Sequence, residues 1–212
     1  GEEILSTLPE RAEKIDCGQF GGKHTLEQDD IEALMVAKAR EGKKVVRLKG
    51  GDPFLFGRGG EEVEVMREHG IPVELVSGVT SALAVPGAVG IPLTHRKYAS
   101  QVTILTGHEE PGKAESGLDW ENLAGNPGTL VILMGVKNIP DITRSLVDHG
   151  KNPDTPVAII ERGLRPDQRV TVGTLRTIAD LSKSRNVRPP AIIVIGDVVR
   201  LYREDDPGLV PL

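Results

Sequence analysis

Residues 49–62 read K-G-G-D-P-F-L-F-G-R-G-G-E-E and hold five glycines in 14 positions. The stretch follows an apolar run, residues 45–48, whose composition predicts a β-strand. Open α/β sheets bind ligands at the carboxyl ends of their strands, and glycines there let a ligand approach the backbone closely. The stretch matches neither the P-loop nor the G-x-G-x-x-G pattern. A solvated turn is the alternative, but Phe54 and Phe56 between the glycines favour a buried, ligand-binding loop.

Strand-like and helix-like segments alternate on both sides of this stretch, which is typical of an α/β protein. We expect two α/β domains, residues 1–98 and 99–212, with parallel or mixed sheets flanked by helices. The second sheet is predicted to be mixed, because the strand at residues 169–173 follows a loop without a helix. A surface loop is expected at residues 109–118. A first strand is expected to end near Cys17, and a loop should follow over residues 18–24. Further strands are predicted at residues 45–48, 73–76, 101–106, 129–134, 157–161, 169–173 and 191–196. Helices are predicted at residues 2–8, 25–39, 60–69, 139–149 and 177–184, and another should follow Ser81. The helix at 25–39 should begin with a capping box formed by Thr25 and Gln28.

The composition narrows the classes of function. The 212 residues carry a net charge of −5 and only 3% aromatic residues, which argues against nucleic-acid binding. The apolar runs are too short to cross a membrane. The single cysteine excludes an internal disulfide framework and favours the cytoplasm. The five histidines show no i,i+4 pairing, so we predict no metal site.

Two clusters of charged residues have the chemistry of a binding site. Arg58 stands between two glycines, which suits a guanidinium that captures carboxylates. Glu61 either pairs with Arg58 or faces a substrate, whereas Glu61 and Glu62 are equally well explained as acids in the first turn of a helix. The second cluster is Thr94-His95-Arg96, in which a lone histidine is more often structural than a ligand.

Five motifs together resemble the tetrapyrrole methylase family. They are V-V-R-L-K-G-G-D-P-F-L-F-G-R-G-G-E-E, S-G-V-T-S-A, G-I-P-L-T-H-R, L-V-I-L-M-G-V and P-A-I-I-V-I-G, in this order along the chain. The first is highly specific, and the resemblance extends to about Leu201.

The resemblance implies a two-domain tetrapyrrole methylase fold that works as a homodimer, with S-adenosylmethionine and a small tetrapyrrole bound in the cleft between the domains. The implied reaction is methylation of uroporphyrinogen III at C2 and C7 to give precorrin-2, a precursor of sirohaem and cobalamin, with S-adenosylhomocysteine as by-product. No nucleic-acid or membrane partner is implied.

The resemblance also assigns residues to these roles. The substrate and catalytic positions match Arg58, Glu61 and Arg96. The cofactor contacts match Gly50, Gly51, Asp52, Leu55, Thr80, Ser81, Met134, Gly163 and Ala191. Arg47 and Lys49 are further candidates for contacts with the substrate's carboxylates.

The chain departs from the family pattern at its start. The family begins with a strand, a glycine-rich loop and a helix ahead of an Asp-containing strand, and we expect this chain to lack them. Gln19 stands where the family has a lysine proposed to donate a proton, and Leu164 stands where threonine is common. Three alternatives stay open: a methylase of a later corrin precursor, a protein-modifying diphthine synthase, and a non-catalytic relative that binds S-adenosylmethionine or S-adenosylhomocysteine.

Overall fold

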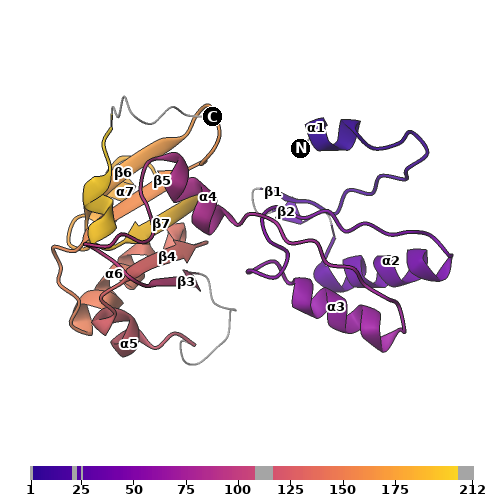
Figure 1. The fold of residues 1–212 in the computed structure, drawn as a ribbon, viewed down its shortest axis with the longest axis horizontal. Coiled ribbons are helices and arrows are strands. Elements are labelled where there is room, and N and C mark those ends of the chain that lie inside the picture. Colours follow the sequence, from indigo (N-terminus) through magenta and orange to yellow (C-terminus); the bar gives the residue numbers. More distant parts are fainter. Residues whose placement is uncertain (1, 21–22, 25, 108–116, 205–212) are drawn as a thin grey trace. The chain divides into compact units, whose positions relative to one another are not determined.

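The computed structural model describes residues 2–20, 23–24, 26–107 and 117–204 (Figure 1). By their contacts, these residues form two packing units. Unit 1 comprises residues 1–49 and 53–77, and unit 2 comprises residues 50–52 and 78–212. The short segment 50–52 of the glycine-rich stretch therefore packs with the second unit. Further along the stretch Phe54 is 53% exposed and Phe56 is 41% exposed, so the burial expected of these two residues is wrong. The domain boundary expected near residue 98 stays a prediction.

Unit 1 is built on two helices, α2 (Gln28–Arg40) and α3 (Gly59–Glu68). They pack through a small core of Ile31, Met35, Val36 and Met66. The unit also contains α1 (Glu2–Ser6) and a two-stranded antiparallel ribbon, β1 (Gln19–Phe20) with β2 (Lys23–His24). The ribbon replaces the loop expected at residues 18–24.

Three expected strands of unit 1 are wrong. Neither the run before Cys17 nor residues 45–48 and 73–76 form strands. Val46 is 75% exposed and Val76 is 77% exposed. In the part of the chain that the structure describes, no neighbouring segment supplies ladder hydrogen bonds to these runs, so composition alone does not make them strands.

The start of α2 also differs from the prediction. The N-cap position is Glu27, without a side-chain cap, and Gln28 is the first helical residue. The Gln28 amide instead donates hydrogen bonds to Glu32 and Glu62. The expected capping box is therefore wrong at Gln28, and its other member, Thr25, lies outside the described residues.

Unit 2 contains a five-stranded sheet in the order β3-β4-β7-β5-β6. The neighbouring strands β3 and β4 run parallel, and the other neighbouring pairs in this sheet run antiparallel. The prediction of a mixed sheet is therefore confirmed. The strands are β3 (Val102–Thr106), β4 (Thr129–Leu133), β5 (Pro156–Glu161), β6 (Arg169–Thr174) and β7 (Ala191–Ile195).

Both faces of this sheet are covered, which explains its continuous apolar strands. Every residue of β5 is buried, and alternate side chains point to opposite faces. Leu130, Ile159 and Ile193 belong to the core that includes the helices on one face, while α4 (Ser81–Ala88) contacts β7 and β4. The helices of that core are α5 (Trp120–Gly125), α6 (Ile139–Asp148) and α7 (Ile178–Ser184), and two 3-10 turns, η1 (Val136–Asn138) and η2 (Asp197–Leu201), complete the unit. Most of the expected surface loop, residues 108–116, lies outside the described residues.

Candidate functional site

One edge of the unit 2 sheet brings together residues from three distant parts of the sequence. Because β7 is antiparallel to both β4 and β5, the end of β4, the end of β5 and the start of β7 meet there. In this register Ala191 pairs with Glu161, and Ile192 pairs with Leu133. The edge therefore collects Met134, Gly163 and Ala191, three of the residues that the family resemblance assigns to the cofactor.

Met134 has a strained backbone at this edge. It follows the last residue of β4 with a φ of 56°, a left-handed conformation that side chains other than glycine adopt only at a cost. Its side chain is 52% exposed. A flexible, polarizable thioether is thus exposed at the end of β4.

Gly163 is a point of close approach to α4. A Cβ atom there would lie 2.4 Å from Val85 Cγ1. The residues on both sides are left-handed, with φ 47° at Arg162 and 63° at Leu164. A larger residue at position 163 would displace the Val85 side chain, so this close approach favours glycine.

The first part of the glycine-rich stretch lies beside the N-terminal end of α4. Thr80 caps the helix, and its side-chain oxygen accepts a hydrogen bond of 3.2 Å from the Ala82 amide. Asp52 accepts a hydrogen bond of 3.2 Å from the Gly78 amide. Gly51 has a φ of 72° and packs beside Thr80, whereas a Cβ at Gly50 would meet open space.

Helix α4 therefore connects the two groups of predicted cofactor residues. Thr80 and Val85 are five residues apart, a rise of about 7.5 Å along the helix axis. Unit 2 holds all the residues of the cofactor prediction except Leu55, which belongs to unit 1. The cofactor residues that unit 2 holds are Gly50, Gly51, Asp52, Thr80, Ser81, Met134, Gly163 and Ala191.

Arg58 and Glu61 lie in unit 1 and pair with each other. Arg58 is the N-cap of α3 with a φ of 56°. Its Nη2 lies 2.6 Å from Glu61 Oε2, and its Nε donates to the same oxygen at 2.8 Å. Both side chains are about half exposed, and the hydrogen bond to Glu61 raises the pKa of Arg58. Glu61 and Glu62 also lie in the first turn of α3, so the structure shows both the pair and the first-turn acids, and contact of Glu61 with a substrate stays a prediction.

The structure adds a buried carboxylate that the sequence did not single out. Glu62 is only 6% exposed. It accepts hydrogen bonds from Lys49 Nζ at 2.8 Å, Arg47 Nε at 3.1 Å and Gln28 Nε2 at 3.2 Å. Burial alone would raise the pKa of Glu62, but these hydrogen bonds outweigh burial and lower it. Arg47 and Lys49, expected as substrate contacts, are engaged by Glu62.

A sequence signal for Glu62 does exist. Gly59, Glu62 and Met66 are all buried and follow the i, i+3, i+7 spacing of one helix face. The spacing indicates which of the two adjacent glutamates points inward.

Arg96 lies at the opposite edge of the unit 2 sheet from Met134. It lines a surface hollow together with Gln101, Pro127 and Gly128, which come immediately before β3 and β4. Strand β4 alone spans about 13 Å between these edges. Arg96 and Arg58 belong to different packing units, so their convergence on one substrate stays a prediction.

Metal sites and membrane-spanning helices are two further features of interest. Within the described ranges, no three His, Cys, Asp or Glu side chains come together in a way that would hold a metal ion. None of the helices in the described part of the chain has both the length and the apolar character needed to cross a bilayer.

The fold and the loops at the sheet edge define a mixed α/β protein of the kind that binds small molecules beside its strand ends. A sequence profile of the family described as tetrapyrrole (corrin/porphyrin) methylases matches residues 2–179. The chain belongs to this family.

Individual relatives agree with this assignment. An S-adenosyl-L-methionine-dependent uroporphyrinogen III methyltransferase of Methanosarcina barkeri is 59% identical over 202 residues, which are 95% of this chain and 79% of the relative. The crystal structure of a uroporphyrin-III C-methyltransferase from Thermus thermophilus with S-adenosylhomocysteine matches with a TM-score of 0.72 and 42% identity, over 82% of this chain and 75% of that one. A cobalt precorrin-4 methyltransferase matches with a TM-score of 0.73 but 26% identity, over 82% and 73% of the two chains.

Proposed function

We propose that this chain is an S-adenosylmethionine-dependent methyltransferase that acts on uroporphyrinogen III at C2 and C7 and forms precorrin-2. The observation that carries the proposal is the 59% identity to a methyltransferase named for this substrate. The lower identity of 26% to the cobalt precorrin-4 enzyme favours the earlier substrate over a later corrin precursor.

The arrangement of unit 2 supports the choice of methyl donor. Its sheet edge and α4 collect backbone loops with open space at Gly50 and an exposed thioether at Met134, and both features suit a nucleoside with a sulfur-bearing chain. S-adenosylmethionine supplies an electrophilic methyl group on a sulfonium. In our proposal Gly50, Gly51 and Gly163 allow close backbone contact with this donor, and Met134 packs against it.

The chemistry asks the chain mainly for positioning. A pyrrole carbon of the substrate is itself nucleophilic, so the chain needs no nucleophile of its own, and rate acceleration comes from holding the two carbons in line. Each methylation ends with loss of a proton from the macrocycle. We assign Glu61 to accept that proton, and this requires Arg58 to exchange Glu61 for a carboxylate of the substrate. Arg96 is proposed as a second carboxylate contact.

We also propose the oligomeric state and the location of the protein. The family resemblance supports a homodimer with its active site between the two domains, and the single cysteine supports a cytoplasmic location. Light scattering on the purified protein tests the dimer, because a monomer at micromolar concentration contradicts it.

The direct test mixes the purified protein with S-adenosylmethionine and uroporphyrinogen III and follows methylation by mass spectrometry. Transfer of two methyl groups is expected. If S-adenosylhomocysteine binds in calorimetry but no methyl group is transferred, the chain is a non-catalytic relative and the proposal is wrong.

Two variants test the separation of roles. Arg58→Ala should weaken tetrapyrrole binding about tenfold and leave S-adenosylhomocysteine binding unchanged, because a carboxylate loses its guanidinium partner. Met134→Ala should do the reverse, by a few fold. Equal loss of both ligands in either variant contradicts the role assigned to that residue.

A further inference from the structure

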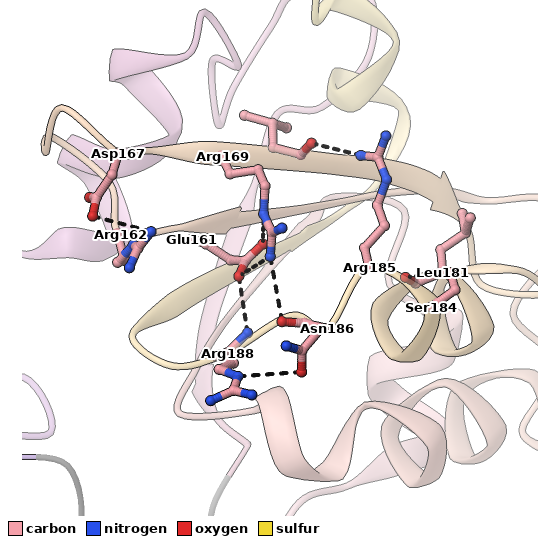
Figure 2. A network of polar contacts seen from close by, with 10 residues as sticks. Glu161, Arg162, Asp167, Arg169, Leu181, Ser184, Arg185, Asn186 and Arg188 are labelled. Atoms are coloured by element: carbon pink, nitrogen blue, oxygen red, sulfur yellow. Dashed lines mark hydrogen bonds and ion pairs between the residues drawn. The ribbon is translucent and has the colours of Figure 1, made fainter.

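A buried carboxylate outside the assigned site residues joins two loops of unit 2 (Figure 2). Glu161, the last residue of β5, is 5% exposed. Its two oxygens accept hydrogen bonds from Arg169 Nε and Nη2, both at 2.7 Å, in the bidentate arrangement of a strong ion pair. Its Oε1 also accepts a hydrogen bond of 3.0 Å from the Arg188 backbone amide.

The carboxylate stays ionised despite its burial. Burial opposes the charge, but the hydrogen bonds from Arg169 and from the Arg188 amide outweigh it and lower the pKa of Glu161. The bond to Glu161 in turn raises the pKa of Arg169. Removal of one partner from such a group would leave a buried charge uncompensated, so the carboxylate and its three hydrogen bonds act as a unit.

The first of its partners closes the loop that carries Gly163. Arg169 begins β6 and faces Glu161 in the strand register, so the pair joins the two ends of residues 162–168. This loop contains the left-handed residues Arg162 and Leu164 on either side of Gly163. Left-handed non-glycine residues persist only when their surroundings fix them.

The second partner belongs to the loop that leads to Ala191. Arg188 lies three residues before β7, and its side chain bonds Asn186 of the same loop at 3.3 Å. The two loops also meet directly, because the Arg162 amide donates a hydrogen bond of 2.9 Å to the Pro190 carbonyl. The carboxylate therefore adds side-chain links between the loop bearing Gly163 and the segment that leads to Ala191, beside the backbone pairing of β5 with β7.

We propose that Glu161 is a positioning residue for methyl-donor binding. Its carboxylate helps to hold the loop of Gly163 and the segment before Ala191 in place at the sheet edge. The inference rests on the proposed function, which places the donor at this edge. Glu161 itself does not touch the donor in this proposal. Its effect passes through Arg169 and the Arg188 amide.

The test replaces the carboxylate by an amide of the same shape. Both oxygens of Glu161 accept from Arg169, so in Glu161→Gln the new NH2 group faces Arg169 in either orientation, at least one hydrogen bond is lost and two donors oppose each other. Calorimetry with S-adenosylhomocysteine should show about tenfold weaker binding than the wild type. Uroporphyrinogen III binding should stay within twofold.

Kinetics distinguish positioning from general damage to the fold. A poorly placed donor site raises the KM for S-adenosylmethionine, and saturating donor restores kcat. A variant that merely unfolds in part has fewer active molecules, so kcat falls and the KM for the donor is unchanged. A fall in kcat at unchanged KM therefore overturns the proposal.

The chain provides a matched control at the other end of the same strands. Asp154 and Arg176 form an exposed pair at 3.2 Å, close to the start of β5 and the end of β6. Asp154→Asn makes the same chemical change as Glu161→Gln in the same unit, away from the donor edge. It should leave the affinity for S-adenosylhomocysteine within twofold of the wild type.

A second variant covers the case in which Glu161→Gln does not fold. Arg169→Lys keeps the charge but loses the bidentate geometry, and it should weaken donor binding several fold, less than Arg169→Ala. If wild type binds S-adenosylhomocysteine and these variants bind it equally well, this inference is wrong and the proposed function stands. If wild type does not bind it, the proposed function fails and takes this inference with it.

Discussion

The two packing units hold themselves together in different ways. Unit 2 contains a five-stranded sheet buried on both faces, with a large core of Ile, Leu and Val side chains. Among its described residues, unit 1 buries Ile31, Met35, Val36 and Met66 in its helical core and places a charged group, Glu62, between three polar partners. We therefore expect apolar burial to dominate the stability of unit 2 and the polar network around Glu62 to contribute strongly to that of unit 1.

The largest expected effect comes from the sheet core. Ile159 is fully buried in β5, so Ile159→Ala should lower the free energy of unfolding by about 3–4 kcal/mol through lost burial and a residual cavity. The contrasting change in unit 1 is Val46→Ala, at a residue that lies outside the core and is 75% exposed. The loss of unfolding free energy there should stay below about 0.5 kcal/mol. Urea unfolding measures both. Similar losses at the two positions would contradict the comparison.

These two positions also show how far the sequence predicts the fold. The strands of unit 2 were predicted to within one residue at each end, because each apolar run there has a neighbour with which to pair. The runs at 45–48 and 73–76 have the same composition, but within the described residues no strand pairs with them. A strand depends on its partner as well as on its own residues, and the partner is not written in the local sequence.

The site was predictable to a different extent. The glycine-rich stretch and Arg58 stand out in the sequence because small residues and an isolated cation have few structural explanations. The helix-face spacing marks Glu62 as the inward glutamate, but no local pattern marks Glu161, and Lys49 and Arg169 reach the two carboxylates only in the folded chain. Pairing between residues of different elements cannot be deduced from composition or spacing.

The second largest effect should come from the polar network of unit 1. Glu62→Ala leaves the cations of Lys49 and Arg47 without their carboxylate partner and should cost about 2–3 kcal/mol, less than for fully buried partners because Arg47 is 29% exposed. The control is Glu64→Ala, an exposed glutamate on the same helix, with an expected loss below about 0.5 kcal/mol. Urea unfolding compares them, and equal losses would show that the network contributes little.

The same network should respond to pH. The pKa of Glu62 lies below its ordinary value of 4.5 in the folded chain, so its contribution is fully present above pH 4.5 and is lost as the pH falls through the lowered pKa. The stability difference between wild type and Glu62→Gln should therefore be largest near neutral pH and shrink in acid. A difference that grows on acidification would mean that the folded-state pKa is raised instead.

A smaller effect is expected where α4 meets the loop of unit 2. In Gly163→Ala the new Cβ meets Val85 Cγ1 at 2.4 Å, and the shift of that side chain should cost about 1–2 kcal/mol. Val85→Ala should relieve the clash, so the double variant should lose less than the sum of the single changes. The control in unit 1 is Gly60→Ala, where nothing lies within 4 Å and the change should stabilise the helix by about 0.5–1 kcal/mol. Thermal unfolding ranks the four variants, and purely additive losses would place the strain elsewhere.

The smallest effect on stability is expected at Arg58. Like Met134 in unit 2, this unit 1 residue has a left-handed backbone, with a φ of 56°. Arg58→Ala should change the free energy of unfolding by less than about 0.5 kcal/mol, since the pair with Glu61 is half exposed and the backbone strain is unchanged. Arg58→Gly removes the strain as well and should be more stable than Arg58→Ala by about 1 kcal/mol. If Arg58→Gly is more stable than Arg58→Ala but no longer binds the tetrapyrrole, the strained backbone at this position lowers stability and the guanidinium serves substrate binding. Urea unfolding together with tetrapyrrole titration of both variants decides this, and unchanged binding in Arg58→Gly would leave the strained conformation without a functional reason.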